Sequence, residues 1–228
     1  MTQKKVLRDL IELLQPKLSP FNFKPNLKEQ GFFRKDEHAT YFYFFNIYNR
    51  TVIQTGEKGY LIEPNAKIGI QAIERYYKEI TVNSYLTSEW NFTTLGNNIA
   101  NLLANPDGIN RQRNKSLDLL IFTETDLYEV ATEIYNKFTN VAMPYFLMNN
   151  TISRVDELLN SYPKEYSVHL VNDLWRFIKG LIAAKLNNNP KLHQLIETYS
   201  NLLIERDMDP DCFQEMENLK KNLSKITS

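Results

Sequence analysis

The sequence is poor in the residue types that most often perform chemistry. Its 228 residues include one cysteine, Cys212, and three histidines, His38, His169 and His193. A single cysteine cannot form an internal disulfide, which excludes the disulfide-stapled secreted domains. No histidine lies in a zinc-binding motif with ligand-like flanks. We predict structural or surface roles for all three, with His38 in a charged turn and the other two on helices.

Glycine is also scarce, and long apolar runs are absent. The seven glycines are scattered, and no glycine-rich loop that could cradle a phosphate precedes a predicted helix. No stretch approaches the roughly 20 apolar residues of a membrane span. Arg8, Asp9 and Glu12 interrupt the apolar residues near the N-terminus, so this segment does not resemble a signal peptide. The sequence therefore predicts a cytoplasmic protein with no membrane contact.

The chain has no excess of charge of either sign. Lysine plus arginine and aspartate plus glutamate number 27 each. Proteins that bind nucleic acid usually carry a basic excess, because phosphate neutralisation supplies much of their affinity. The densest basic cluster, Arg111–Lys115, has three charges and is typical of a solvated loop. Nucleic acid is therefore an unlikely partner.

The first third of the chain reads as one helix followed by a sheet. Apolar residues recur at helical spacing over residues 3–18, and Pro16 and Pro20 are expected to stop this helix. The aromatic run at 41–48 has large side chains at alternating positions on both faces, which predicts a central strand covered on two sides. Strand character continues at 51–55 and 59–70 around a turn, and short turns indicate antiparallel pairing.

Short elements follow, and then helices. We predict a helix at 72–80, a strand at 85–94, a helix at 95–104, and either a strand or a helix start at 117–122. A long apolar stripe begins near Thr125, the expected N-cap, and Pro144 should kink or end that helix near Met143. A short helix is expected at 151–161. The remaining three carry the apolar positions of 171–182, 192–203 and 213–226, the last with Asp209 as N-cap.

These elements together predict an α+β fold. We expect an N-terminal helix, an antiparallel sheet of four to five strands packed with helices, and a helical C-terminal region. Residues 1–124 form the mixed region and 125–228 the helical one, and the two are expected to pack as one integrated unit.

Three motifs that could carry chemistry are incomplete. Cys212 has no nearby base that would activate a thiol. The segment 207–211 begins like a calcium loop, but its sixth position is Cys212 and its twelfth is Asn218. Asp156 and Glu157 are neighbours on a helix, where side chains point apart, so we expect a solvated face. The sequence predicts no catalytic residue, no cofactor and no metal site.

Four segments resemble an uncharacterised bacterial domain family of the Bacteroidetes type. They are Gly31–Lys35, Ile62–Ile70, Ala142–Phe146 and Gly180–Leu186. The family has no established active site to carry over. Such domains resemble immunity proteins or other protein-binding proteins, so the resemblance implies a protein partner.

Two functions are consistent with these observations. The first is a non-catalytic protein that binds another protein, since catalytic parts are missing. The alternative is an enzyme or small-ligand binder whose site is assembled from dispersed residues. A deep polar pocket containing carboxylates or a histidine of perturbed pKa would favour the alternative. The sequence leaves a homo-oligomer open.

Overall fold

The structure is a computed structural model, which describes residues 2–82 and 93–227, and it has the predicted α+β fold. The strands are β1 (Lys24–Asn26), β2 (Gly31–Lys35), β3 (Ala39–Thr51), β4 (Lys58–Ile70), β5 (Leu95–Asn98) and β6 (Leu119–Ile121). The helices are α1 (Gln3–Leu18), α2 (Gln71–Ile80), α3 (Ile99–Ala104), α4 (Glu124–Lys137), α5 (Met143–Met148), α6 (Ile152–Asn160), α7 (Asp173–Leu186), α8 (Leu192–Glu205) and α9 (Pro210–Asn222). The strand expected at 85–94 falls largely outside the described residues.

All strand pairs of the six-stranded sheet are antiparallel. The order is β1-β2-β3-β4-β5, and β6 also pairs with β4. The long β3–β4 hairpin is the centre of the sheet, with Ala39 opposite Ile70 and Thr51 opposite Lys58. Because β3 occupies one edge of β4, β5 and β6 share the other edge at different heights. The segment 117–122, ambiguous in sequence, thus contains a strand.

One face of β3 forms the core, and the other is only half-covered. Tyr41, Tyr43 and Phe45 are fully buried, whereas Phe42 and Phe44 between them are partly exposed. The expectation of a strand covered on both sides is therefore only half right. The sequence pattern misleads because aromatic side chains occupy both faces, but helices lie mainly on one of them.

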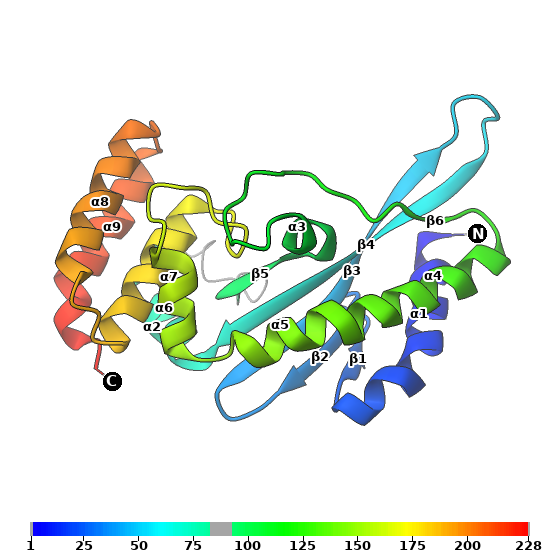
Figure 1. The fold of residues 1–228 in the computed structure, drawn as a ribbon, viewed down its shortest axis with the longest axis horizontal. Helices are drawn as coiled ribbons and strands as arrows, with labels where there is room; N and C mark the ends of the chain where they lie inside the picture. Colours follow the sequence, from blue (N-terminus) through cyan, green and yellow to red (C-terminus); the bar gives the residue numbers. More distant parts are fainter. Residues whose placement is uncertain (1, 83–92, 228) are drawn as a thin grey trace.

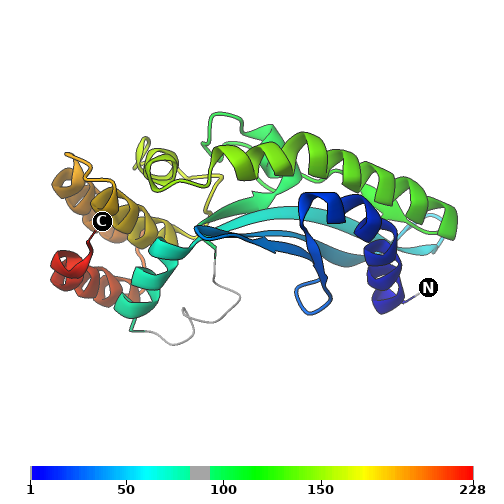
Figure 2. The same ribbon diagram turned by 90° about the horizontal axis from the view of Figure 1, so that it is seen from below.

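Two groups of helices cover the sheet (Figures 1 and 2). Helices α1, α4 and α5 lie along the buried face, where the ring centroid of Phe138 is 5.2 Å from that of Tyr43. Helices α2 and α6 to α9 gather at one end of the sheet, and the tip of the β3–β4 hairpin projects at the other. No helix in the described ranges 2–82 and 93–227 is long and apolar enough to cross a membrane.

Pro16 does not end its helix as expected, and Pro144 lies where one helical segment passes into the next. Pro16 lies inside α1, which continues to Leu18 because Leu14 and Leu18 are buried in the core. Near Pro144 the chain widens into a π-helical segment, η4 (Phe138–Ala142), and continues directly as α5. A π-turn shifts the carbonyl register ahead of the proline, so the missing amide does not break the helical path.

Three element boundaries also differ from expectation. Thr123, rather than Thr125, is the N-cap of α4, and Asp126 completes a capping box with it. Residues Leu95–Asn98 form strand β5 instead of a helix, because the Asn98 side chain accepts from the Asn101 amide and starts α3 only at Ile99. Strand β3 ends at Thr51, so the segment 51–55 is mostly turn.

Candidate functional site

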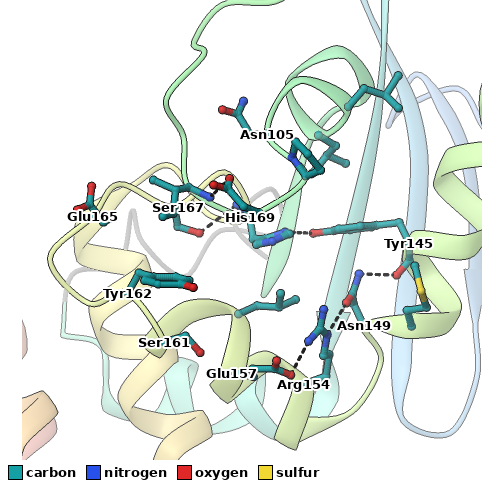
Figure 3. Close-up of a pocket in the computed structure, with 18 of the residues that line it drawn as sticks. Asn105, Tyr145, Asn149, Arg154, Glu157, Ser161, Tyr162, Glu165, Ser167 and His169 are labelled. Carbon is teal, nitrogen blue, oxygen red and sulfur yellow. Dashed lines mark hydrogen bonds and ion pairs between the residues drawn. The ribbon is translucent and has the colours of Figure 1, made fainter.

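A cleft of about 480 Å³ opens between the sheet and the helical end of the molecule (Figure 3). One wall comes from α3 and the loop that follows it, and the opposite wall from η4, α5 and α6. The segment 161–169, the first part of the connection from α6 to α7, closes the third side. The lining residues that matter for its chemistry are Asn105, Asp107, Gly108, Tyr145, Asn149, Arg154, Glu157, Tyr162, Glu165, Ser167, His169 and Arg176.

His169 is buried in the floor of the cleft and contacts Tyr145 (Figure 3). The Tyr145 hydroxyl lies 3.1 Å from His169 Nδ1, and the two rings stack with centroids 5.8 Å apart. Burial lowers the pKa of His169 to about 4, with a smaller contribution in the same direction from the charge of Arg154. Burial also raises the pKa of the Tyr145 hydroxyl. The imidazole is therefore neutral at neutral pH, and the phenol keeps its proton.

The contact between Tyr145 and His169 uses one ring nitrogen and leaves the other for the cleft. Either the Tyr145 hydroxyl or Nδ1 can be the donor, according to the tautomer of the ring. In the tautomer in which the hydroxyl donates to Nδ1, the other nitrogen, Nε2, carries the hydrogen. Nε2 lies beside Gly108, where an added Cβ would approach it to 3.1 Å. The floor thus presents a ring nitrogen next to a residue that lacks a side chain.

Backbone hydrogen bonds hold the histidine segment between two neighbours. The His169 carbonyl accepts from the Gly96 amide of β5 at 2.6 Å, and the Val168 amide donates to the Gly108 carbonyl at 3.0 Å. The His169 amide donates to Ser167 Oγ at 3.1 Å. His169 therefore lies in a bend of the connection between α6 and α7 and not on a helix, which corrects the sequence-based expectation.

Arg154 on α6 carries the positive charge of the opposite wall. Its Nε donates to Asn149 Oδ1 at 3.2 Å, and its Nη1 forms an ion pair with Glu157 (Figure 3). Asn149 in turn donates to the Tyr145 carbonyl at 2.9 Å. This chain of hydrogen bonds orients the guanidinium of Arg154 while its side chain remains 39% exposed.

A buried arginine shapes the segment that closes the cleft. Arg176 on α7 donates to the carbonyls of Leu159, Tyr162 and Glu165, all near or beyond the end of α6. These carbonyls would otherwise lack partners after the helix ends. Arg176 therefore fixes the course of the chain that carries His169, although nothing in the sequence marks it.

Large apolar side chains stand at the rim of the cleft. Leu103, Met148, Tyr162 and Tyr166 line it, and each is at least 43% exposed. They are four of the thirteen exposed large hydrophobic residues identified in the described ranges. Arg113 stacks over the Tyr166 ring at 4.3 Å, which places part of the basic loop 111–115 against this rim. The polar floor of the cleft is thus surrounded by solvent-exposed apolar side chains.

A second polar cluster is buried outside the cleft. Lys179 Nζ donates to both carboxylate oxygens of Glu74 at 2.9 Å, and Thr94 Oγ1 donates to Glu74 at 2.6 Å. Lys179 is completely buried in α7, and burial lowers its pKa. The sequence analysis missed this pair. A signal exists in the run 177–184, because a helix that is apolar all round must be buried, and a lysine inside it then needs a partner.

Asp156 is also buried, contrary to the expectation of a solvated face. It accepts hydrogen bonds from Asn160 at 2.6 Å, from Asn187 at 2.8 Å and from Asn189 at 2.9 Å. Its neighbour Glu157 points into the cleft instead, so the two carboxylates do diverge. Asn160 is one turn further along α6, but Asn187 and Asn189 come from the α7–α8 turn, which is distant in sequence.

The remaining sequence candidates lie apart from one another. His38 and His193 are exposed, the latter on α8 as expected. Burial and the nearby acidic residues 209, 211 and 215 raise the pKa of the Cys212 thiol, which outweighs any help from the start of α9. No group of three or more His, Cys, Asp or Glu in the described part of the chain could hold a metal ion.

No family model, no curated protein and no solved structure matches this chain. The resemblance to a bacterial protein-binding family therefore stays a prediction, and the function rests on the geometry of the cleft.

Proposed function

We propose that this chain is a non-catalytic binding protein that holds a segment of a protein partner in the cleft of Tyr145, Arg154 and His169. The observation that carries the proposal is the exposed apolar rim around a polar floor. Apolar rim residues supply area for association, and fixed polar groups below them supply specificity. An extended peptide would meet both requirements if its apolar side chains contacted the rim and one polar or charged group reached the floor.

The titratable groups of the floor support binding rather than catalysis. A general base works best with a pKa near the operating pH, whereas burial lowers the pKa of His169 to about 4. Its neighbour Ser167 already accepts the His169 amide and does not form a nucleophile–base pair with the ring. The arrangement of His169 and Ser167 suits binding of a ligand rather than reaction with it.

A small-ligand binder is the second candidate. The cleft volume of about 480 Å³ lies in the usual range of small-molecule sites, roughly 300–1,000 Å³. The buried histidine of perturbed pKa is the feature that we expected for this class. The two candidates differ at the apolar rim. A protein partner would cover the rim, whereas a small ligand would leave it exposed.

Site-specific photo-crosslinking tests the proposal. A photoreactive phenylalanine replaces Tyr162 at the rim or, as the control, Tyr128, which is comparably exposed on α4 and does not line the cleft. We expect one protein to crosslink at position 162 in native cells and not at 128, and Met148→Asp to abolish that crosslink. Equal crosslinking at both positions, or none at 162, would overturn the proposal.

A further inference from the structure

We propose that the cleft recognises a carboxylate attached to an apolar body, with Arg154 as the ion-pair partner and His169 Nε2–H as a hydrogen-bond donor. This inference rests on the proposed binding role and specifies the group that the cleft holds. Two sources share the chemistry: the C-terminal carboxylate of a peptide and a small organic acid.

Arg154 and His169 supply the unpartnered donors of the proposed site. Both side-chain atoms of Asn105 and of Asn149 already form hydrogen bonds with the protein. In the tautomer that we propose, the Tyr145 hydroxyl donates to His169 Nδ1. Arg154 Nη2 and His169 Nε2 have no acceptor in the described residues. A ligand that satisfies this floor must therefore bring acceptor atoms, and a carboxylate brings two.

The charge nearest in effect to the floor is that of Arg154. The ionisable lining groups are Asp107, Arg154, Glu157, Glu165, Arg176, His169 and the three tyrosines, so the cleft as a whole has no positive excess. Asp107 forms an ion pair with Arg111, outside the floor, and Arg176 is occupied by backbone carbonyls. The charge of Arg154 adds to the lowering of the pKa of His169 and opposes the rise that burial causes in the pKa of Tyr145. An anion beside these two rings would therefore be attracted by Arg154.

Glu157 is the group that competes with the ligand. Its carboxylate pairs with Arg154 Nη1 and is 59% exposed, so it can rotate into solvent when a ligand arrives. The other guanidinium nitrogen, Nη2, is left for the ligand. The two substitutions should therefore change ligand affinity in opposite directions. Arg154→Gln removes the positive charge that binds the ligand, whereas Glu157→Gln frees that charge from its partner.

Apolar groups next to Arg154 define the rest of the ligand. Val141, Pro144, Met148 and Leu158 line the same cleft, on the side of η4, α5 and α6. An aryl or branched alkyl group would bury apolar surface there while its carboxylate contacts the floor. A peptide that ends in leucine and 4-phenylbutyrate both satisfy this description.

The test is an NMR titration of the full chain with four probes. The acids are 4-phenylbutyrate and a tetrapeptide ending in leucine, and the controls are their neutral amides. Imidazole signals report the pKa of each histidine, and exposed His38 and His193 are internal references. We expect both acids to raise the pKa of His169 by about one unit without moving the references, because an adjacent anion stabilises the imidazolium.

The variants then locate the carboxylate. We expect Arg154→Gln to weaken binding of the acids by about ten-fold or more, as for loss of a charged hydrogen bond, and Glu157→Gln to tighten it. Arg154 is partly exposed and Glu157 is exposed, so neither change should unfold the chain. If the amides bind as tightly as the acids, or if Arg154→Gln has no effect, the carboxylate inference is wrong.

The outcomes separate this inference from the proposed function. A protein partner that crosslinks at position 162, combined with equal binding of acid and amide peptides, retains the binding role and rejects the carboxylate. Binding of 4-phenylbutyrate without any peptide binding or crosslinked partner retains the carboxylate site and rejects the protein partner. Binding of the acid peptide in preference to its amide supports both.

Discussion

The single residue with the clearest pH signature is His169. Burial lowers its pKa to about 4, from the 6.5 of an unfolded histidine. Between pH 6.5 and pH 4 the unfolded chain binds a proton on this ring and the folded chain does not. The folded state therefore loses stability as the pH falls through this range. The difference of 2.5 units corresponds to about 3 kcal/mol of unfolding free energy by pH 4.

A variant isolates this contribution from other acid-sensitive groups. His169→Asn keeps an acceptor near the Tyr145 hydroxyl but cannot bind the proton. Urea unfolding of both chains at pH 7 and pH 4 should show the natural protein losing about 3 kcal/mol more than the variant over that interval. Equal losses would mean that the ring is accessible to protonation in the folded state.

The buried charges of Lys179 and Glu74 each require the other for stability. Lys179→Met leaves the Glu74 carboxylate buried beside Thr94 without its cation, and we expect a loss of about 3–5 kcal/mol in unfolding free energy. Adding Glu74→Gln removes the uncompensated charge, so the double variant should be more stable than Lys179→Met alone. Chemical denaturation of the four chains of this cycle measures the coupling, and strict additivity would contradict it.

At the scale of elements, the packing of α6 against α7 depends on Gly180. A Cβ at this position would lie 2.6 Å from Asn160 Oδ1. That side chain cannot move aside easily, because it donates to the Gly180 carbonyl at 2.8 Å and to Asp156 at 2.6 Å, and accepts from Tyr199 at 2.7 Å.

Gly180→Ala should therefore destabilise the protein even though alanine favours helices. The gain in helix propensity is about 1 kcal/mol, and we expect overpacking and distortion of the Asn160 bonds to exceed it, with a net loss of about 1–2 kcal/mol. Thermal unfolding measures the change. A stabilised Gly180→Ala chain would show that α6 and α7 can separate locally.

Elements with a strong local pattern were predictable, and those defined by distant partners were not. The apolar spacing of residues 3–18 and the alternation in β3 and β4 identified α1 and the central hairpin. Strand β5 was assigned to a helix, because its four residues are extended only through pairing with β4. The chain stays helical on both sides of Pro144 because of η4, and a π-turn has no sequence signal that we could use.

The cleft could not be predicted because it belongs to the whole molecule. Tyr145 and His169 are 24 residues apart, and a backbone bond to Gly96 positions the histidine segment. Asn105 arrives from the other side through its own loop. In the sequence, His169 was only one of three histidines and was expected on a helix. A site assembled from three distant segments needs no sequence motif.

The two regions separated at residue 124 share one core at the scale of the molecule. Tyr43 of β3 donates to the Ile134 carbonyl of α4 at 2.8 Å, and Phe146 stacks on Phe23 with ring centroids 5.7 Å apart. At the other end, Glu74 of α2 holds Lys179 of α7. A chain that ended at residue 124 would expose the aromatic face of the sheet and leave the Glu74 carboxylate without this cation.

We therefore expect the fragment 1–124 to lack a cooperative fold by itself. Without residues 125–228, the buried face formed by Tyr41, Tyr43 and Phe45 loses α4 and α5, and too little apolar surface is removed from water to offset the chain entropy. Backbone NMR spectra should show poor dispersion for 1–124 alone and native-like dispersion once 125–228 is co-expressed with it. A fragment that unfolds cooperatively alone would divide the molecule into two independent domains, and the cleft, which takes its floor from both regions, would then lie at a domain interface.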